Sequence, residues 1–187
     1  MAVKEVYFAT SSSSRLAAAK QIFWKKGIIV KPLPKTYTET QGKTGKEIAQ
    51  ATARQAAREY RLPVMREYKS LFLEALGGFP GPYLHHFHKE ISAEKLLDIM
   101  KNHQEKKGLF VIDTVLSFPE GELIEANTNI GIKIAGKLKG NTGNWEKVLI
   151  RQESDKTFAE ERDKESEEFK EIFSKNLKEI AEKLLTK

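Results

Sequence analysis

The sequence predicts an α/β fold, and three observations support this prediction. A strand-like segment at 3–9 leads through a serine-rich loop into a helical segment. Another short apolar segment at 28–30 precedes an alanine-rich helical stretch, and two extended segments at 109–118 and 123–134 flank a turn typical of a β-hairpin. Strands that alternate with helices indicate a sheet covered by helices.

The first elements follow from apolar runs and capping residues. Val3–Ala9 reads as a buried strand, and the hydroxyl run Thr10–Ser14 that follows it can cap a helix over Arg15–Trp24. Ile28–Val30 is a second strand, which nearby prolines close. Residues 45–60 are rich in Ala, Arg, Gln and Glu and predict a strong helix.

The middle of the chain begins with a strand at Pro63–Met65, followed by the apolar segment Leu71–Leu76. Gly77–Pro82 holds three glycines and two prolines and is expected to form a loop. Ser92 is expected to cap a helix that runs from Ala93 to about Lys106.

The C-terminal part combines a hairpin with a long helix. Pro119–Glu122 is the hairpin turn, and Trp145–Ile150 is a candidate strand. Apolar residues at helical spacing predict a final helix over Lys164–Leu185. We find no linker, so we expect one domain over residues 1–187.

Composition narrows the functional classes. The 187 residues are 40% hydrophobic and 31% charged, contain no cysteine and carry a net charge of +6. No apolar run is long enough for a membrane span and no signal-peptide layout occurs, so we expect a cytoplasmic protein without disulfides. The positive charge suits anionic partners, but it forms no Lys/Arg run, so we do not expect nucleic acid as a partner.

The loop Thr10–Arg15 is a candidate phosphate site. Backbone N–H groups, hydroxyls and an arginine stand there before a helix N-terminus, which attracts anions. The alternative is a capped helix with spare serines.

Other candidates are weaker. His85, His86 and His88 form a cluster that can bind zinc, and on a strand His86 and His88 would share a face, but solvated loop histidines are the alternative. Glu39 and Glu67 are single carboxylates that spacing alone cannot pair, and without further information each reads as a surface residue.

Four motifs in order resemble the inosine triphosphate pyrophosphatase family, whose members hydrolyse non-standard purine nucleoside triphosphates. They are Phe8-Ala9-Thr10, Glu39-Thr40-Gln41-Gly42, the segment 74–83 (EALGGFPGPY) and the segment 156–160 (KTFAE). The resemblance covers about residues 3–185. It implies an elongated mixed sheet flanked by helices, with two lobes around a nucleotide cleft, and a homodimer. The implied reaction is Mg²⁺-assisted hydrolysis to a monophosphate and pyrophosphate.

Carried over residue by residue, the resemblance assigns the phosphate loop to Thr10, Ser12 and Arg15, and metal binding to Glu39 and Glu67. The family motif Glu/Asp-Asp-Ser-Gly-Leu appears here as Glu67-Tyr68-Lys69-Ser70-Leu71. Tyr68 thus stands where the family has the aspartate that serves metal and water. A phenol does not replace that carboxylate, and Lys69 adds a positive charge beside it.

The base-binding elements also differ from the family. Trp145 and Glu146 occupy the loop that contacts the base, which is one residue shorter, and there Trp145 offers a stacking face. The family's Ser-His-Arg, which reads the purine, falls on Lys170-Glu171-Ile172.

Scaffold motifs are kept while chemical groups are replaced at three places. The resemblance therefore predicts a family member with weak or lost catalysis that binds a purine nucleotide or another phosphate ligand. One alternative is an active Mg²⁺-dependent pyrophosphatase of altered specificity, in which Glu39 and Glu67 hold one ion. An alternative of another class is a basic nucleic-acid-binding protein.

Overall fold

The computed structural model describes residues 5–33, 37 and 40–186. The chain forms two compact units. Unit 1 contains residues 1–68, 112–128 and 174–187, and unit 2 contains residues 69–111 and 129–173.

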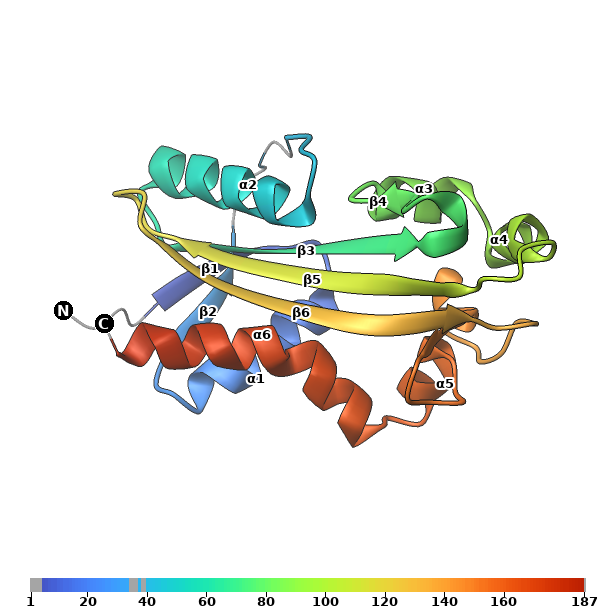
Figure 1. Cartoon of the computed structure of the whole chain (residues 1–187). Helices are drawn as coiled ribbons and strands as arrows, with labels where there is room; N and C mark the ends of the chain where they lie inside the picture. Colours follow the sequence, from blue (N-terminus) through green and yellow to red (C-terminus); the bar gives the residue numbers. More distant parts are fainter. Residues whose placement is uncertain (1–4, 34–36, 38–39, 187) are drawn as a thin grey trace. The chain divides into compact units, whose positions relative to one another are not determined.

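The strands belong to one mixed sheet (Figure 1), in the order β2-β1-β3-β5-β6-β7 with β4 paired to β3. β1 is parallel to β2 and β3, whereas β7 is antiparallel to β6. The strands are β1 (Glu5–Ala9), β2 (Ile29–Pro32), β3 (Val64–Leu73), β4 (Pro80–Gly81), β5 (Lys107–Ser117), β6 (Leu123–Ile134) and β7 (Leu149–Arg151). The expected α/β fold with a mixed sheet is confirmed.

Helices flank the strands of both units. They are α1 (Ser13–Trp24), α2 (Gly45–Tyr60), α3 (Leu84–Glu90), α4 (Ala93–Met100), α5 (Phe158–Asp163) and α6 (Glu167–Leu185). Single 3₁₀ turns occupy Glu74–Leu76 and Trp145–Lys147. Among the helices in the described ranges, none has the length and apolarity that crossing a membrane requires.

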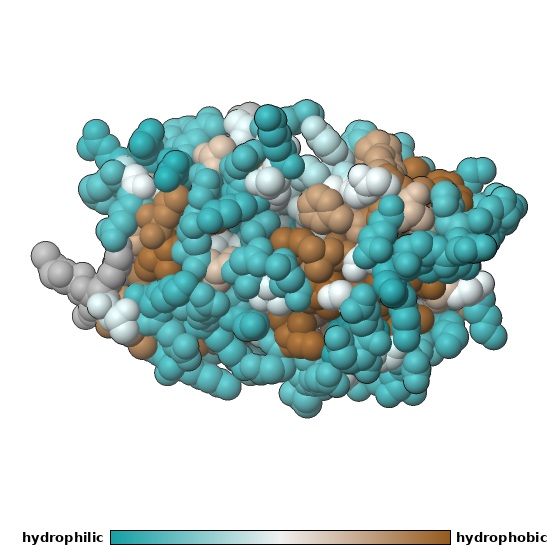
Figure 2. All heavy atoms as spheres, viewed as in Figure 1, coloured by the Kyte–Doolittle hydropathy of each residue, from teal (hydrophilic) through white to brown (hydrophobic). Residues whose placement is uncertain are grey.

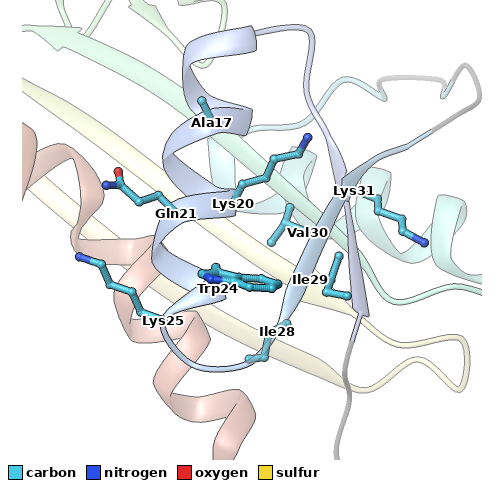
Figure 3. A pocket seen from close by; sticks show the side chains of 9 residues that line it. All are labelled: Ala17, Lys20, Gln21, Trp24, Lys25, Ile28, Ile29, Val30 and Lys31. Atoms are coloured by element: carbon cyan, nitrogen blue, oxygen red, sulfur yellow. The ribbon is translucent and has the colours of Figure 1, made fainter.

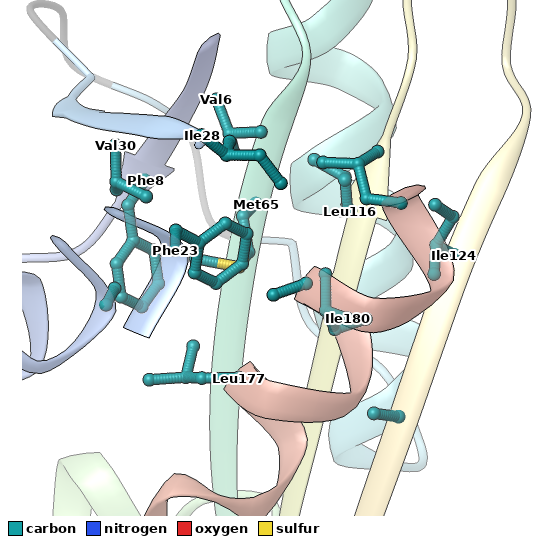
Figure 4. Packing of buried hydrophobic residues seen from close by; sticks show 14 of the residues in the cluster. Val6, Phe8, Phe23, Ile28, Val30, Met65, Leu116, Ile124, Leu177 and Ile180 are labelled. Carbon is teal, nitrogen blue, oxygen red and sulfur yellow. The ribbon is translucent and has the colours of Figure 1, made fainter. Parts of the chain in front are cut away.

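In unit 1, α2 covers one face of the strands, and α1 and the end of α6 cover the other (Figure 1). The main core lies on the second face. Figure 4 shows Leu177 and Ile180 of α6 facing the strand that carries Met65, with Phe23 of α1 beside it, and all four are buried. The apolar spacing of the last helix therefore reflects core packing, as the sequence indicates.

A buried asparagine fixes α6 on this face. The amide nitrogen of Asn176 donates to the carbonyl oxygen of Ile112 (2.8 Å) and to the hydroxyl of Thr114 (3.2 Å). Its oxygen accepts from the hydroxyl of Thr128 at 2.6 Å. Asn176 is 1% exposed, so these bonds replace water for each polar group and set the position of the helix.

Unit 2 has an aromatic core and a buried ion pair. The ring of Phe158 in α5 packs edge-on against Phe110 (centroids 5.6 Å apart) and Phe173 (5.5 Å). Arg151 of β7, 3% exposed, donates to Glu161 of α5 at 2.9 Å. This pair satisfies two charges that would be costly to bury alone.

Several predicted boundaries are confirmed. The helix at Gly45–Tyr60 and the strand at Leu123–Ile134 have the predicted ends, and Ser92 caps α4 by accepting from the N–H of Lys95. The first strand is seen from Glu5, because residues 3 and 4 lie outside the described part.

Five details of the sequence prediction are wrong. The expected loop at Gly77–Pro82 contains β4, which pairs with β3. The helix from Ala93 ends at Met100 instead of about Lys106, because the carbonyl of Lys106 already accepts from Ile134 in the sheet (2.8 Å). Trp145 starts a 3₁₀ turn, and the strand begins at Leu149.

The other two details concern helices. Residues 164–166 do not belong to the final helix, because α5 ends at Asp163 and the chain turns at Glu165 with φ 51° before α6. The histidine segment is helical, so strand alternation does not apply to it.

Candidate functional site

The loop before α1 is organised as a helix cap. The hydroxyl of Ser12 accepts from the N–H of Arg15 (3.3 Å), and the N–H of Ser12 donates to the hydroxyl of Thr10 (3.1 Å). The alternative that the sequence left open, a capped helix, therefore describes this loop. The exposed serines and the helix N-terminus remain compatible with a phosphate.

Arg15 and Glu67 bind each other. The guanidinium donates two parallel bonds to the carboxylate, from Nε to Oε1 (2.9 Å) and from Nη2 to Oε2. The side chains are only 14% and 6% exposed. A phosphate or a metal ion at either residue must therefore compete with a partly buried, bidentate ion pair.

Tyr68 lies on the other face of β3, because successive strand residues point to opposite faces. It is 9% exposed and belongs to an apolar cluster with Ile48, Ala49 and Ala53 of α2 and Val115 of β5. The position that the resemblance assigns to the family's aspartate is thus part of the packing between α2 and the sheet.

Arg66 shares this face with Tyr68. Its guanidinium lies 5.8 Å from the Tyr68 ring and 5.1 Å from the Tyr37 ring. Its Nη1 donates to the carbonyl of Ala9 (2.9 Å) and to the Tyr37 hydroxyl (3.0 Å). A cation is therefore fixed beside the phenol, and sequence reasoning missed it because nothing in the motif marks Arg66.

Two carboxylates also lie on the α2 face. Asp113 of β5 is 5% exposed and accepts from the amide of Asn127 at 2.8 Å. Burial raises the pKa of Asp113, although Asn127 and the nearby Lys46 oppose the rise. Two sequence features could have marked Asp113 as a candidate. It stands inside an apolar strand, and only four of the 26 acidic residues of this chain are Asp.

Glu125 of β6 is paired with α2. Lys46 contacts its carboxylate at 2.8 Å and the amide of Gln50 also donates to it. Burial would raise the pKa of Glu125, but these two hydrogen bonds and the positive charges of Lys46 and Arg54 together outweigh burial and lower it. The α2 face thus carries Arg66, Tyr68, Asp113, Asn127 and Glu125, with Lys46 and Gln50 above them.

Metal binding was predicted for Glu39 and Glu67. Glu39 lies outside the described residues, and both oxygens of Glu67 accept from Arg15. Across the described ranges, no three His, Asp or Glu side chains form a group that could hold a metal ion. Magnesium in nucleotide sites is bound through one or two carboxylates together with waters and substrate phosphates, so Glu67 would serve as a ligand only in competition with Arg15.

In unit 2, Trp145 is an interior residue. The indole is 1% exposed, and its N–H donates to the carbonyl of Ile91 at 2.7 Å. A stacking role would require the ring to leave this position, so its contact with a base stays a prediction.

Glu146 is held beside Trp145. It contacts Nε2 of His88 at 3.1 Å and accepts from the N–H of Asn144 at 3.0 Å. Burial would raise its pKa, but the bonds from His88 and from backbone N–H groups outweigh burial and lower the pKa to about 2. His88 thus positions this loop, and the sequence did not connect the two.

The other singled-out residues lie on helices of unit 2. His85 and His86 stand on α3, without a metal-binding group around them among the described side chains. At the predicted purine-reading position, Lys170 pairs with Glu167 (3.0 Å) and Glu165 (3.5 Å), and Ile172 is half-buried. The segment 156–160 forms the capping box of α5, in which Thr157 and Glu160 bond each other's backbone N–H.

Comparison with known proteins identifies the family. The model of the Ham1 family matches residues 6–181. A dITP/XTP pyrophosphatase of Methanopyrus kandleri is 33% identical over 157 residues, which are 83% of this chain and 84% of that protein. One of Hyperthermus butylicus is 30% identical over 170 residues, 90% and 89% of the two chains.

Solved structures agree with this assignment at the level of the fold. The Ham1 protein of Staphylococcus aureus superposes with a TM-score of 0.82 at 23% identity, over 98% of this chain and 99% of that one. A Ham1 protein from Coxiella burnetii gives a TM-score of 0.80 at 22% identity, over 97% and 96%. The sequence matches and the fold together show that this chain belongs to the Ham1 family, the inosine triphosphate pyrophosphatase family that its motifs resemble.

Proposed function

We propose that this protein binds a purine nucleotide or another phosphate ligand and hydrolyses it weakly or not at all. One observation carries the proposal: Tyr68, at the position of the family's aspartate, packs against α2 with Ile48, Ala49 and Ala53. On this face of β3 no other residue supplies a carboxylate in place of that aspartate. The names of the relatives, dITP/XTP pyrophosphatases, support a nucleotide as the ligand.

Magnesium is the cofactor that the family suggests. A bound ion would neutralise phosphate charge and polarise the attacked phosphorus. The described side chains at this position fit it poorly, because both oxygens of Glu67 already accept from Arg15 and Tyr68 supplies no carboxylate. We therefore derive no catalytic step through the metal.

A pyrophosphate-release assay tests the proposal. ITP, XTP, dITP and the four standard NTPs are offered with Mg²⁺ or Mn²⁺, and a thermal-shift titration runs in parallel. We expect at least one nucleotide to raise the melting temperature without turnover, because a ligand of the folded state stabilises it. Robust metal-dependent release of pyrophosphate would contradict the proposal.

The phosphate loop is tested by a double variant. Arg15→Gln with Glu67→Gln removes both charges of the pair, so no buried charge is left alone. We expect the ligand-induced shift to shrink, since Arg15 is the cation of the proposed loop. Lys175→Gln, an exposed change of one charge on α6, is the control and should leave the shift unchanged.

A second candidate is an active enzyme of altered specificity. Asp113 and Glu125 favour it, because both carboxylates lie on the face that Tyr68 shares. If pyrophosphate is released, Asp113→Asn should abolish the release while the fold is kept. Activity that survives this change would exclude Asp113 from the reaction.

Further parts of the proposal rest on the family resemblance and on composition. We propose one two-lobed domain that forms a homodimer in the cytoplasm, without nucleic acid as a partner. Light scattering after size exclusion measures the mass in solution, and a molar mass of one chain at micromolar concentration would exclude the dimer.

A further inference from the structure

A groove between α1 and β2 is not used by the proposed nucleotide site. Its volume is about 640 Å³, within the range of protein ligand sites. Figure 3 shows its lining, with the Trp24 indole reaching from the end of α1 toward Ile29 of β2. The lining residues are Ala17, Lys20, Gln21, Trp24, Lys25, Ile28, Ile29, Val30 and Lys31.

β2 is the edge of the sheet and pairs only with β1 along the described path. Leu33 donates its N–H to Phe8 of β1 at 3.1 Å, so alternate residues of β2 turn their main chain toward β1. Val30 therefore turns its N–H and C=O outward. Pro32 adds an outward C=O but no N–H, which keeps the open edge short.

Apolar surface stands along this edge. Trp24 is 71% exposed and Ile29 is 44% exposed, although both are large apolar side chains. Exposed tryptophan is costly in water and is enriched where proteins bind partners. The other tryptophan, Trp145, is buried.

Positive charge surrounds the apolar surface. Lys20, Lys25 and Lys31 line the groove, and none of the described lining residues is acidic. Lys31 is paired with Glu5 at 2.9 Å, whereas Lys20 and Lys25 form no ion pair with any described residue. The groove thus offers, beside a tryptophan, two lysines that have no acidic partner among the residues that the structure describes.

We propose that this groove docks an extended, acidic peptide segment of a partner protein, which adds a strand to β2. Val30 supplies the N–H and C=O groups that bond to the main chain of the peptide. Trp24 and Ile29 contact apolar side chains of the peptide on the two faces of the added strand. The lysines attract carboxylates of the peptide that flank these side chains. A second copy of this chain would bring the same lysines together and repel. Single-stranded nucleic acid uses several aromatic platforms, and this groove has one.

A selection experiment with the full chain tests the proposal. A phage-displayed library of random heptapeptides is panned on the immobilised protein and, in parallel, on Trp24→Ser, a change at an exposed side chain that keeps the fold. We expect peptides with Asp or Glu beside apolar residues to be enriched on the native protein only. Absence of enrichment, or enrichment of basic peptides, would overturn the proposal.

A selected peptide is then titrated while tryptophan emission is followed. Trp24→Ser and the pair Lys20→Glu with Lys25→Glu should each weaken binding at least about tenfold, as for central interface residues. Lys175→Glu, an exposed lysine away from the groove, is the control for charge and should change binding less than about twofold. Equal losses in all variants would point to non-specific attraction and would overturn the proposal.

Peptide N-methylation tests the strand geometry. Methyl groups on one set of alternate amides should abolish binding, and those on the other set should leave it intact, because only one set faces β2. Insensitivity to both sets would exclude strand addition. If a decauridylate binds through Trp24 and no peptide does, the groove is a nucleic-acid site. If the protein forms a dimer that Trp24→Ser abolishes, the groove is occupied by a second copy of this chain. Either result would overturn the proposal.

Discussion

Residues 67 and 68 show how one step along a strand separates two roles. Glu67 points to the face where Arg15 holds it, and Tyr68 points to the face that α2 covers. A motif read as letters places these residues at one site. The strand places them on opposite sides of the sheet. Their spacing in the sequence therefore does not show which side chains can act together at one site.

Placing an aspartate at position 68, as the family motif suggests, should destabilise the protein. Tyr68→Asp puts a carboxylate among Ile48, Ala49 and Val115 and removes an aromatic ring from their cluster. We expect a loss of about 3 kcal/mol in the free energy of unfolding, as for buried polar replacements. Urea denaturation measures it, and a loss below about 1 kcal/mol would show that the cluster opens readily to water.

For Asp113 we expect a substitution that raises the free energy of unfolding instead of lowering it. Because burial raises its pKa in the folded state, ionisation of Asp113 costs stability, and stability falls as the pH rises above the unfolded value. Asp113→Asn removes this cost and should stabilise the protein at pH 8 by about 0.5–1 kcal/mol. Glu125→Gln is the matched control, because the pKa of Glu125 is lowered and its loss should destabilise at the same pH. Thermal melts of the two variants should therefore shift in opposite directions.

At the scale of elements, caps and turns decided what could be predicted. Thr44 and Ser92 accept from N–H groups at the starts of α2 and α4, and both starts were predicted. The end of α4 was missed because a sheet bond to Lys106 competes with the helix, and such a bond is not visible in local sequence. The buried state of Trp145 likewise depends on Ile91, which is 54 residues away.

The loop that carries Glu146 should loosen in acid. Its pKa of about 2 lies below the ordinary 4.5, so the stabilisation is complete above about pH 4.5 and is lost as the pH falls toward 2. Glu146→Gln should lose about 2–3 kcal/mol at pH 7 and should flatten the stability curve between these values. Hydrogen exchange of the 143–148 amides at pH 3 and 6 measures the effect, and equal protection at both pH values in the native protein would contradict it.

The stability of the protein should depend strongly on Asn176, the buried residue that fixes α6. Asn176→Ala removes the partner of the Ile112 carbonyl and of the Thr114 and Thr128 hydroxyls. We expect a loss of about 2–4 kcal/mol, because these three groups and the carbonyl of Ala126, which accepts from Asn176 at 3.3 Å, each lose a bond. Lys175→Ala changes the exposed neighbour and should cost less than about 0.5 kcal/mol in the same denaturation experiment.

At the scale of the molecule, family motifs were more informative than periodicity. The segments 74–83 and 156–160 identified the family, while the α/β class came from alternating apolar segments alone. Sequence could not supply the pairing of Arg15 with Glu67, since 52 residues separate them. It also could not reveal the α1–β2 groove, because a single exposed tryptophan reads as core until its surroundings are known.

The two units should unfold together. β3, β5, β6 and α6 each pass from one unit into the other, so melting one unit frays elements of the other. Trp24 reports on unit 1 and Trp145 on unit 2, and Trp24→Phe and Trp145→Phe isolate each signal. We expect coincident urea midpoints for the two signals, and midpoints that differ by more than about 0.5 M would show separate domains.

The order in which the chain is made bears on how unit 1 is completed. Its core joins Val6 and Phe8, near the start of the chain, to Leu177 and Ile180, near the end. Proteins emerge from the ribosome N-terminus first, at about 5–20 residues per second. The first strand is therefore synthesised many seconds before the helix that covers it. During that time its apolar face is exposed to water unless another protein binds it. A nascent chain stalled before residue 174 should bind a chaperone that recognises exposed apolar segments, and one extended until 187 has cleared the exit tunnel should not.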